Sequence, residues 1–396
     1  MSSTPQCVAE RDGIRPKPNL TWKTKLLLKA MSWIVQPSLR PNMTVNRRLV
    51  NFFDLKVPQS PSPHPRSDGI ASSDTIVDPS RNLWFRLFNP IHPTTGGNEV
   101  EGMPVIVFYH GGGFILGHAN SMAMDIMARR LARELHAIVL SVDYRLAPEH
   151  RFPCQYEDGF DALRFIDEMD SRDLPASADL GRCFLAGESA GGNLAHHVAV
   201  RAGEYDFKRV NLLGLIAIQP FFGGEERVES EMEFSQGPVL SLELTDWFWK
   251  AFLPEGSDRD HSAANVFGPN KVDISGLRFP PTLLFVGGCD PLRDWEIRYC
   301  EGLKKSGKQV YLVDYPNAVH GFASFNETSE ASLFLSEVKD FMQKQMAKLT
   351  REVTKWGIDV RSHRCTNYDE EDLLAWGERV RKPCFKAALD YWWGSK

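Results

Sequence analysis

The chain has 396 residues, of which 42% are hydrophobic and 24% are charged, a balance typical of a globular protein with a sizeable core. Its 46 Lys and Arg residues stand against 51 Asp and Glu, and no long basic run occurs, so nucleic acid is not expected as a partner. The 7 cysteines are scattered without a close pair, which indicates free thiols in a reducing compartment rather than a disulfide framework or a zinc site.

The N-terminal residues do not resemble a targeting segment. Glu10 and Asp12 occur early, and the apolar triplet at 26–28 is followed at once by Lys29, which argues against a secretory signal or a transit peptide. No apolar run reaches the length of about 18 residues that a membrane span needs. We therefore expect a cytoplasmic protein, or one that also enters the nucleus.

The first part of the chain predicts helices, a linker and then strands. Residues 1–20 are polar and contain proline, which predicts disorder. Apolar residues recur at helical spacing over 22–35, and a second short helix is expected over 46–55. The proline-rich stretch 57–65 predicts a linker or surface loop. Strand-like runs at 70–77 and 83–88 predict an antiparallel pair.

From residue 104 onward, strands and helices alternate. The predicted elements are a strand at 104–109, a helix at 121–136, a strand at 137–143, a helix at 156–169, strands at 182–187 and 211–219 around a helix at 190–201, then a strand at 282–287, a helix at 292–306, a strand at 309–315 and a helix at 329–348. This alternation predicts an α/β fold with a mostly parallel sheet and helices on both faces. Strands 104–109 and 282–287 are apolar on both sides, as strands covered on both faces should be.

Two segments interrupt the alternation. Residues 220–280 follow a strand in the middle of the sheet, where an insertion would cover the edge of the sheet as a cap. Residues 349–396 combine tryptophans with many charges, and we expect an unpacked or weakly docked extension there with one helix near 370–380. No function is assigned to this C-terminal extension.

A serine lies on a predicted sharp turn between strand 182–187 and helix 190–201. The stretch Gly187-Glu188-Ser189-Ala190-Gly191 matches Gly-x-Ser-x-Gly, the motif of the nucleophile elbow. Glycines on either side of the serine remove the side chains that would clash when the backbone bends abruptly. Ser189 is therefore the predicted nucleophile.

A run of three glycines follows the buried strand 104–109, in His110-Gly111-Gly112-Gly113. Backbone N–H groups at such a site can point toward a bound ligand with no side chain in the way. We expect Gly112 and Gly113 to hold an oxyanion together with the N–H of Ala190, the residue after the nucleophile.

A serine hydroxyl needs a base, and the base needs a carboxylate that orients it. Asp290 and His320 follow the strands predicted at 282–287 and 309–315, at the sheet edge where the carboxyl ends of parallel strands meet. They are the predicted acid and base, and no metal or organic cofactor is needed. Asp294 is the alternative carboxylate. His196 and His197, on the helix after Ser189, are interpreted as packing or surface residues.

Five ordered motifs together resemble the hormone-sensitive-lipase-like branch of the α/β-hydrolases, and within it the plant carboxylesterases. They are His110-Gly-Gly-Gly113, Asp143-Tyr-Arg-Leu-Ala-Pro-Glu-His150, Gly187-Glu-Ser-Ala-Gly-Gly-Asn193, Asp290-Pro-Leu292 and His320-Gly-Phe322. The resemblance runs from about Trp22 to Ala347. It implies a serine carboxylesterase that hydrolyses a small-molecule ester through an acyl-enzyme, with a structural turn at 144–149.

The resemblance also implies a domain organisation. Residues 1–57 would form a disordered N-terminus and a helical lid, 58–348 the α/β-hydrolase catalytic domain with its cap insertion at 220–280, and 349–396 a separate C-terminal extension. The lid and cap segments are rich in Trp and Phe, which suggests that the substrate has an apolar or aromatic group.

A second branch of the same family consists of gibberellin receptors, which bind a hormone in the former active site beneath an N-terminal lid. The chain resembles them in Asn46-Arg47-Arg48-Leu49 and around Asp246-Trp247. Those receptors carry an apolar residue in place of the triad histidine, whereas His320 is intact here. This chain also has Leu244 and Thr245 where the receptors have an Asp-Arg pair.

A further departure is Ala323, where the receptors have a tyrosine. These differences favour an enzyme over a hormone receptor. A lyase or a transacylase on the same scaffold is the remaining alternative, and the reaction products would distinguish it from a hydrolase.

Overall fold

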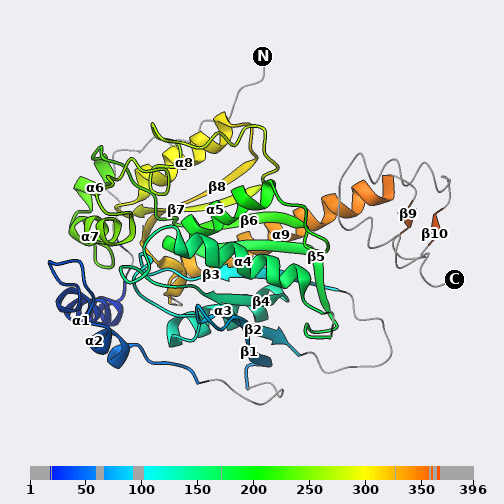
Figure 1. The fold of residues 1–396 in the computed structure, drawn as a ribbon, viewed down its shortest axis with the longest axis horizontal. Helices are drawn as coiled ribbons and strands as arrows, with labels where there is room; N and C mark the ends of the chain where they lie inside the picture. The colour runs from blue at the N-terminus through cyan, green and yellow to red at the C-terminus, as the bar shows by residue number, and fades with distance from the viewer. Residues whose placement is uncertain are drawn as a thin grey trace.

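The computed structural model describes residue 18 and residues 20–58, 67–91, 102–170, 172–325, 327–355, 358–359 and 364–365. Its centre is an eight-stranded sheet with the order β1-β2-β4-β3-β5-β6-β7-β8 (Figure 1). The strands are β1 (Ile70–Asp78), β2 (Leu83–Pro90), β3 (Met103–Tyr109), β4 (Ile138–Asp143), β5 (Ala178–Glu188), β6 (Leu212–Ile218), β7 (Thr282–Cys289) and β8 (Val310–Val319). β2 pairs antiparallel with β1 and β4, and the other pairings in this sheet are parallel. The predicted mostly parallel sheet, preceded by an antiparallel pair, is confirmed.

Helices cover both faces of the sheet, because alternate residues of a strand point to opposite sides. In β3, Val105 and Val107 belong to one apolar core, whereas Ile106 and Phe108 belong to another. Helices α4 and α5 contribute to the first core, α3 and α9 contribute to the second, and α8 packs on β7 through a third cluster. The bounds of these helices are α3 (Met122–Leu135), α4 (Cys154–Glu168), α5 (Ala190–Gly203), α8 (Arg293–Lys305) and α9 (Ser329–Lys355).

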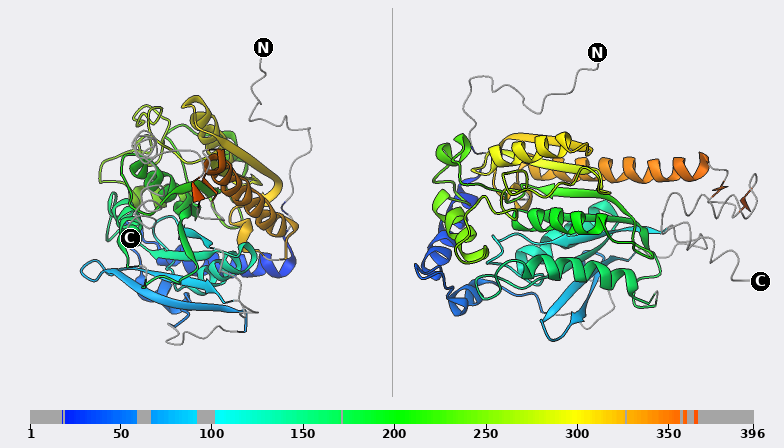
Figure 2. Two further views of the ribbon diagram at one scale, coloured as in Figure 1. Left: turned by 90° about the vertical axis from the view of Figure 1, so that its right-hand side faces the viewer. Right: turned by 45° about the horizontal axis from the view of Figure 1, so that its top comes forward.

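The N-terminal helices and the helices of the cap insertion lie together at one end of the molecule, on the left of Figure 1, whereas α9 extends from the opposite end (Figure 2). These are α1 (Trp22–Ser38), α2 (Arg47–Phe53), α6 (Glu229–Glu233) and α7 (Leu242–Phe252). The indole Nε1 of Trp247 on α7 donates to the carbonyl of Arg40 at 3.1 Å. At the other end of the lid, Thr24 donates to the carboxylate of Glu327. The lid is thus joined to the cap and to the loop that precedes α9.

Several elements are longer than their sequence patterns predict, among them β8 and α9. β8 continues through Pro316 to Val319, which is permitted because β8 lies at the edge of the sheet, where a missing N–H costs little. α9 continues to Lys355 because neither glycine nor proline occurs between residues 348 and 355 to end it. Two strands of two residues each follow and pair antiparallel, β9 (Ile358–Asp359) and β10 (Arg364–Cys365).

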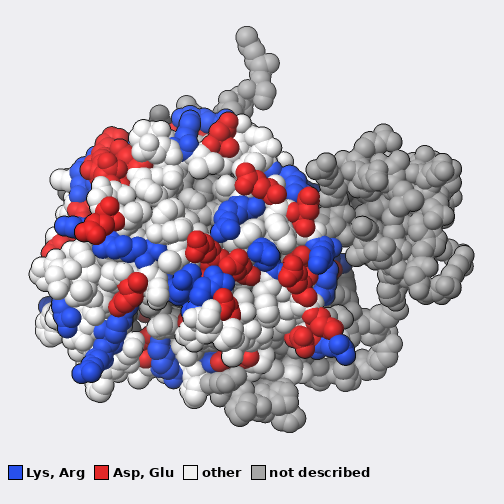
Figure 3. All heavy atoms as spheres, in the orientation of Figure 1, with Lys and Arg blue, Asp and Glu red and all other residues white. Residues whose placement is uncertain are grey.

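Some expectations concern residues that the structure does not describe. The predicted helix near 370–380 lies outside the described residues, as do nearly all of the predicted disordered segment 1–20 and most of the proline-rich stretch 57–65. Across the described ranges, no helix is both long and apolar enough to cross a bilayer. On the face shown in Figure 3, basic and acidic side chains are interspersed over the surface.

Candidate active site

Ser189 lies on a strained turn between β5 and α5. Its backbone has φ +54° and ψ −119°, a conformation that non-glycine residues rarely adopt. A Cβ on Gly191 would lie 1.9 Å from the carbonyl oxygen of Tyr109, and one on Gly187 would lie 2.1 Å from that of Gly191. Only glycine therefore permits this close approach of the turn to β3. The Ser189 N–H donates to the carbonyl of Ile218 at 2.9 Å, which holds the turn against β6.

The structure brings the predicted serine, histidine and aspartate together. Nε2 of His320 lies 2.9 Å from Oγ of Ser189, and Nδ1 of His320 lies 2.7 Å from Oδ2 of Asp290. The exposed fractions are 8% for Ser189, 7% for His320 and 0% for Asp290, so all three side chains are largely shielded from solvent. The other oxygen of Asp290, Oδ1, accepts from the N–H of Leu292 at 2.9 Å.

Gln219 is part of this constellation, although the sequence analysis did not identify it. Its Nε2 donates to Oδ2 of Asp290 at 2.6 Å, and its Oε1 accepts from the N–H of Gly321 at 2.8 Å. This buried amide therefore joins the carboxylate to the loop that carries His320. The only sign of it in the sequence is its place at the carboxyl end of a buried strand, directly before Pro220.

The charges around His320 favour its protonated form. Burial lowers the pKa of His320, but the carboxylate of Asp290 raises it through its charge and its hydrogen bond, and Glu188 adds to this, so that the pKa lies above the usual value. Burial raises the pKa of Glu188 itself, and its Oε1 meets no hydrogen-bond donor among the described residues. The imidazolium that forms when a base accepts a proton would therefore be stabilised at this position.

The glycine loop after β3 has a backbone that other residues rarely adopt and leaves two of its N–H groups without an acceptor in the described part of the chain. Gly112 and Gly113 have φ +110° and +63°, and a Cβ on Gly112 would lie 2.1 Å from the carbonyl oxygen of Leu116. Within the described residues, the N–H groups of Gly112, Gly113 and Ala190 donate no hydrogen bond and remain available for a ligand. A Cβ on Gly113 would lie 2.2 Å from the ring of Phe248, so the cap helix α7 rests directly on this loop.

Aromatic side chains join the cap to the loop. The ring of Phe114 stacks on Phe252 with centroids 3.9 Å apart, and Phe221 stacks on Trp249 at 4.1 Å. All four are buried, and they belong to the same apolar core as the sheet. The cap is therefore a packed part of the domain, and it reaches the nucleophile elbow through Phe221, whose N–H donates to the carbonyl of Ser189 at 2.9 Å.

The remaining candidates have structural partners. Asp294 accepts from the N–H of Ser230 at 2.8 Å, so it braces the cap insertion. His196 pairs with the hydroxyl of Tyr299 at 3.0 Å, and His197 stacks on Tyr156 with centroids 4.2 Å apart. Both histidines thus contact aromatic side chains, which agrees with the packing role, one of the two roles that the sequence left open. In the described part of the chain, no group of three or more His, Cys, Asp or Glu side chains could hold a metal ion.

Comparisons with known proteins found a family model and many relatives for this chain. The family model for the α/β-hydrolase fold matches residues 106–324. The gibberellin receptor GID1C of Arabidopsis thaliana is 41% identical over 312 residues, which cover 76% of this chain and 88% of the receptor. Carboxylesterase 20 of the same plant is 36% identical over 308 residues, which cover 76% of this chain and 93% of that protein.

Solved structures of esterases share the fold. A hyperthermophilic esterase from the archaeon Pyrobaculum calidifontis superposes with a TM-score of 0.64 at 28% identity, and the match covers 83% of this chain and 99% of the esterase. An esterase of the fungus Rhizomucor miehei superposes with a TM-score of 0.66 at 24% identity, a likeness of fold alone. Relatives of this chain thus include both enzymes and hormone receptors.

Proposed function

The chain belongs to the α/β-hydrolase family, and from that premise we propose that it is a serine carboxylesterase that hydrolyses small carboxylic esters. The observation that carries the proposal is the continuous set of hydrogen bonds from Ser189 through His320 to Asp290. A receptor needs no such base, whereas an esterase needs all three groups within hydrogen-bond reach. For the domains we keep the predicted division into an N-terminal segment with a helical lid over 1–57, a catalytic domain with its cap insertion over 58–348 and an extension over 349–396, although α9 crosses the last boundary and runs to Lys355.

In the proposed reaction, Oγ of Ser189 attacks the carbonyl carbon of the ester while Nε2 of His320 accepts the hydroxyl proton. Asp290 holds the imidazole with its Nδ1 protonated and stabilises the imidazolium. The developing oxyanion accepts hydrogen bonds from the N–H groups of Gly112, Gly113 and Ala190. His320 then gives the proton to the departing alcohol.

The second half of the reaction repeats these roles with water. His320 accepts a proton from a water molecule, which attacks the acyl group on Ser189 and releases the carboxylic acid. The buried aromatic wall formed by the cap supports a substrate with an apolar group. The site therefore favours uncharged esters, because a charged group placed against that wall would lose its solvation.

A receptor-like function is the second candidate, because several relatives are gibberellin receptors and the N-terminal helices contact the cap. Product analysis separates the candidates. Incubation with a set of small esters should yield equal amounts of acid and alcohol. Elimination would give an alkene, and acyl transfer would give a second ester. Saturable binding of labelled gibberellin without product would favour the receptor.

The activity should decrease as the pH falls, with a midpoint above about 6.5, the usual pKa of histidine. His320 must be neutral to accept the proton, and the charge of Asp290 keeps it protonated to a higher pH than usual. Below the midpoint, kcat/KM should fall about tenfold per pH unit. Glu188→Gln should move the midpoint to lower pH, because it removes a carboxyl group that favours the imidazolium. A midpoint that rises in this variant would contradict the assignment.

A further inference from the structure

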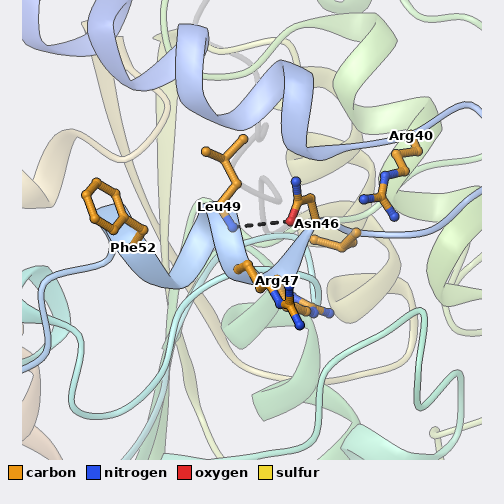
Figure 4. Close-up of a pocket in the computed structure, with 7 residues that line it drawn as sticks. Arg40, Asn46, Arg47, Leu49 and Phe52 are labelled. Atoms are coloured by element: carbon orange, nitrogen blue, oxygen red, sulfur yellow. Dashed lines mark hydrogen bonds between the residues drawn. The ribbon is translucent and has the colours of Figure 1, made fainter.

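We propose that Arg47 in the lid is a positioning residue that fixes the oxyanion loop, so that docking of α2 and catalysis are coupled. This inference rests on the proposed ester hydrolysis. Arg47 is the first residue of α2, and Asn46 caps that helix by accepting from the N–H of Leu49 at 3.3 Å. Figure 4 shows Leu49 pointing toward α1 while the side chain of Arg47 extends to the other side of α2.

The guanidinium group of Arg47 contacts the loops on which the site depends. Its Nη1 donates to the carbonyl of Ile115, and its Nη2 donates to the carbonyl of Ala147 at 2.6 Å. It also forms a bidentate salt bridge with the carboxylate of Glu149, in which Nη2 donates to Oε2 at 2.6 Å and Nε donates to Oε1 at 3.0 Å. The two loops are joined to each other as well, because the N–H of Ala147 donates to the carbonyl of Phe114 at 2.9 Å.

A short chain of peptide groups leads from Arg47 to the predicted oxyanion donor. The carbonyl of Ile115 accepts from Arg47, and the N–H of the same peptide unit, that of Leu116, donates to the carbonyl of Gly112 at 2.9 Å. The carbonyl of Gly112 in turn shares its peptide plane with the N–H of Gly113. Each peptide unit is rigid and planar, so fixing the carbonyl at one side fixes the N–H at the other.

Arg47 therefore acts on the Gly113 donor in two ways. It fixes the orientation of two successive peptide planes, and its positive charge polarises the aligned hydrogen bonds toward the oxyanion. Gly112 and Gly113 have positive φ, a region in which glycine has wide freedom, so the loop needs such an external restraint. Arginine suits this role because its planar group holds several acceptors in a fixed arrangement, whereas the three donors of a lysine ammonium rotate freely on a flexible stem.

The lid has other attachments that do not involve Arg47. Trp247 donates to the carbonyl of Arg40, Thr24 donates to Glu327, and the N–H of Val57 donates to the carbonyl of Asn120 at 2.8 Å. A variant at position 47 should therefore keep the lid docked and change only the loop. Glu149 remains half-exposed at the surface, so loss of its partner does not bury an uncompensated charge.

The test compares Arg47→Met with Arg48→Met. The adjacent Arg48 lies on the same helix, is exposed, and forms no hydrogen bond within the described part of the chain, so it is a matched control for charge and helix propensity. Loss of a whole oxyanion donor costs about 10²–10³-fold in kcat. A donor that is retained but misoriented should cost less, so we expect Arg47→Met to lower kcat about 10- to 100-fold with KM nearly unchanged.

A transition-state analogue separates positioning from general damage. Trifluoromethyl ketones form a tetrahedral oxyanion on the serine, so their Ki should rise in Arg47→Met by the same factor by which kcat/KM falls. Arg48→Met should match the wild type in both measurements. If Arg47→Met folds poorly, Arg47→Lys serves instead, with a smaller loss of kcat at an unchanged melting temperature.

Three results would overturn the proposal: full kcat in the Arg47 variants, a loss confined to KM, or an equal loss in Arg48→Met. In each of these cases the wild type still hydrolyses esters, so the proposed function stands while the role of Arg47 fails. A folded wild type without esterase activity would instead refute the proposed function, and this inference with it.

Discussion

Replacing His320 by alanine is expected to lower kcat for a short-chain ester by at least about 10⁴-fold, because the Ser189 hydroxyl then has no base. The fold should survive, since Asp290 keeps its hydrogen bonds from Leu292 and from Gln219 and is not left as an unpaired buried charge. Steady-state kinetics with p-nitrophenyl butyrate measure the loss, and a thermal melt checks the fold. Retention of more than about a tenth of kcat would remove His320 from the role of base.

The double variant shows whether the residues act as one unit. Ser189→Ala should lower kcat about as much as His320→Ala, and Ser189→Ala combined with His320→Ala should cost no more than either change alone. The residual rate in all three would come from the oxyanion donors and from substrate binding. Losses that multiply in the double variant would show two independent contributions and would contradict a triad.

Asp290→Asn is expected to reduce kcat by about 10⁴-fold, because an amide can donate to Nδ1 of His320 and stabilise the wrong tautomer. The side chains are nearly the same size, but an amide nitrogen in place of Oδ2 would also face Nε2 of Gln219, which donates to that oxygen in the wild type, so a thermal melt should accompany the kinetics. Rates should be measured with the same ester over a range of pH, since a tautomer effect persists at every pH.

Asp294→Asn is the matched control for Asp290→Asn. Asp294 lies on the same segment but accepts from the N–H of Ser230 rather than from His320, so its replacement should leave kcat within a few-fold of the wild type. The sequence alone left Asp294 as the alternative acid. Low activity in Asp294→Asn with normal activity in Asp290→Asn would reverse the assignment.

The parts of the fold that follow from periodicity could be predicted from the sequence. The runs of apolar residues in β3 and β7, together with the helical spacing between strands, predict a parallel sheet with helices on both faces. In such a sheet the carboxyl ends of the strands lie at one edge, so the residues that follow each strand lie close together. Ser189, Asp290 and His320 each follow such a strand, which is why their proximity could be predicted. The catalytic roles of these residues remain predictions.

The contacts between distant loops could not be predicted in the same way. Gln219 and Arg47 act through side-chain hydrogen bonds to backbone carbonyls and N–H groups, and hydrophobic periodicity says nothing about such partners. In the sequence, Arg47 stands out only as part of a motif that resembles the receptors. Its partners lie roughly 70 and 100 residues away in the chain, a separation at which only the folded structure shows which groups meet.

The same scaffold serves enzymes and receptors, so the fold alone does not decide the function. The relatives include both classes, so what favours an enzyme is the site of this chain. Here the histidine is present and lies within hydrogen-bond reach of Ser189 and Asp290. The N-terminal lid is consistent with either function, because a lid can retain a hormone or exclude water from an ester during hydrolysis.

Release of p-nitrophenol from p-nitrophenyl acetate and butyrate by the purified chain, with Ser189→Ala alongside, shows whether the protein is a serine esterase. We expect steady turnover by the wild type and a rate no higher than the background in the variant. Turnover that is equal in both proteins would show that Ser189 is not the nucleophile. No turnover by a folded wild type would contradict the esterase and favour a binding function for the same site.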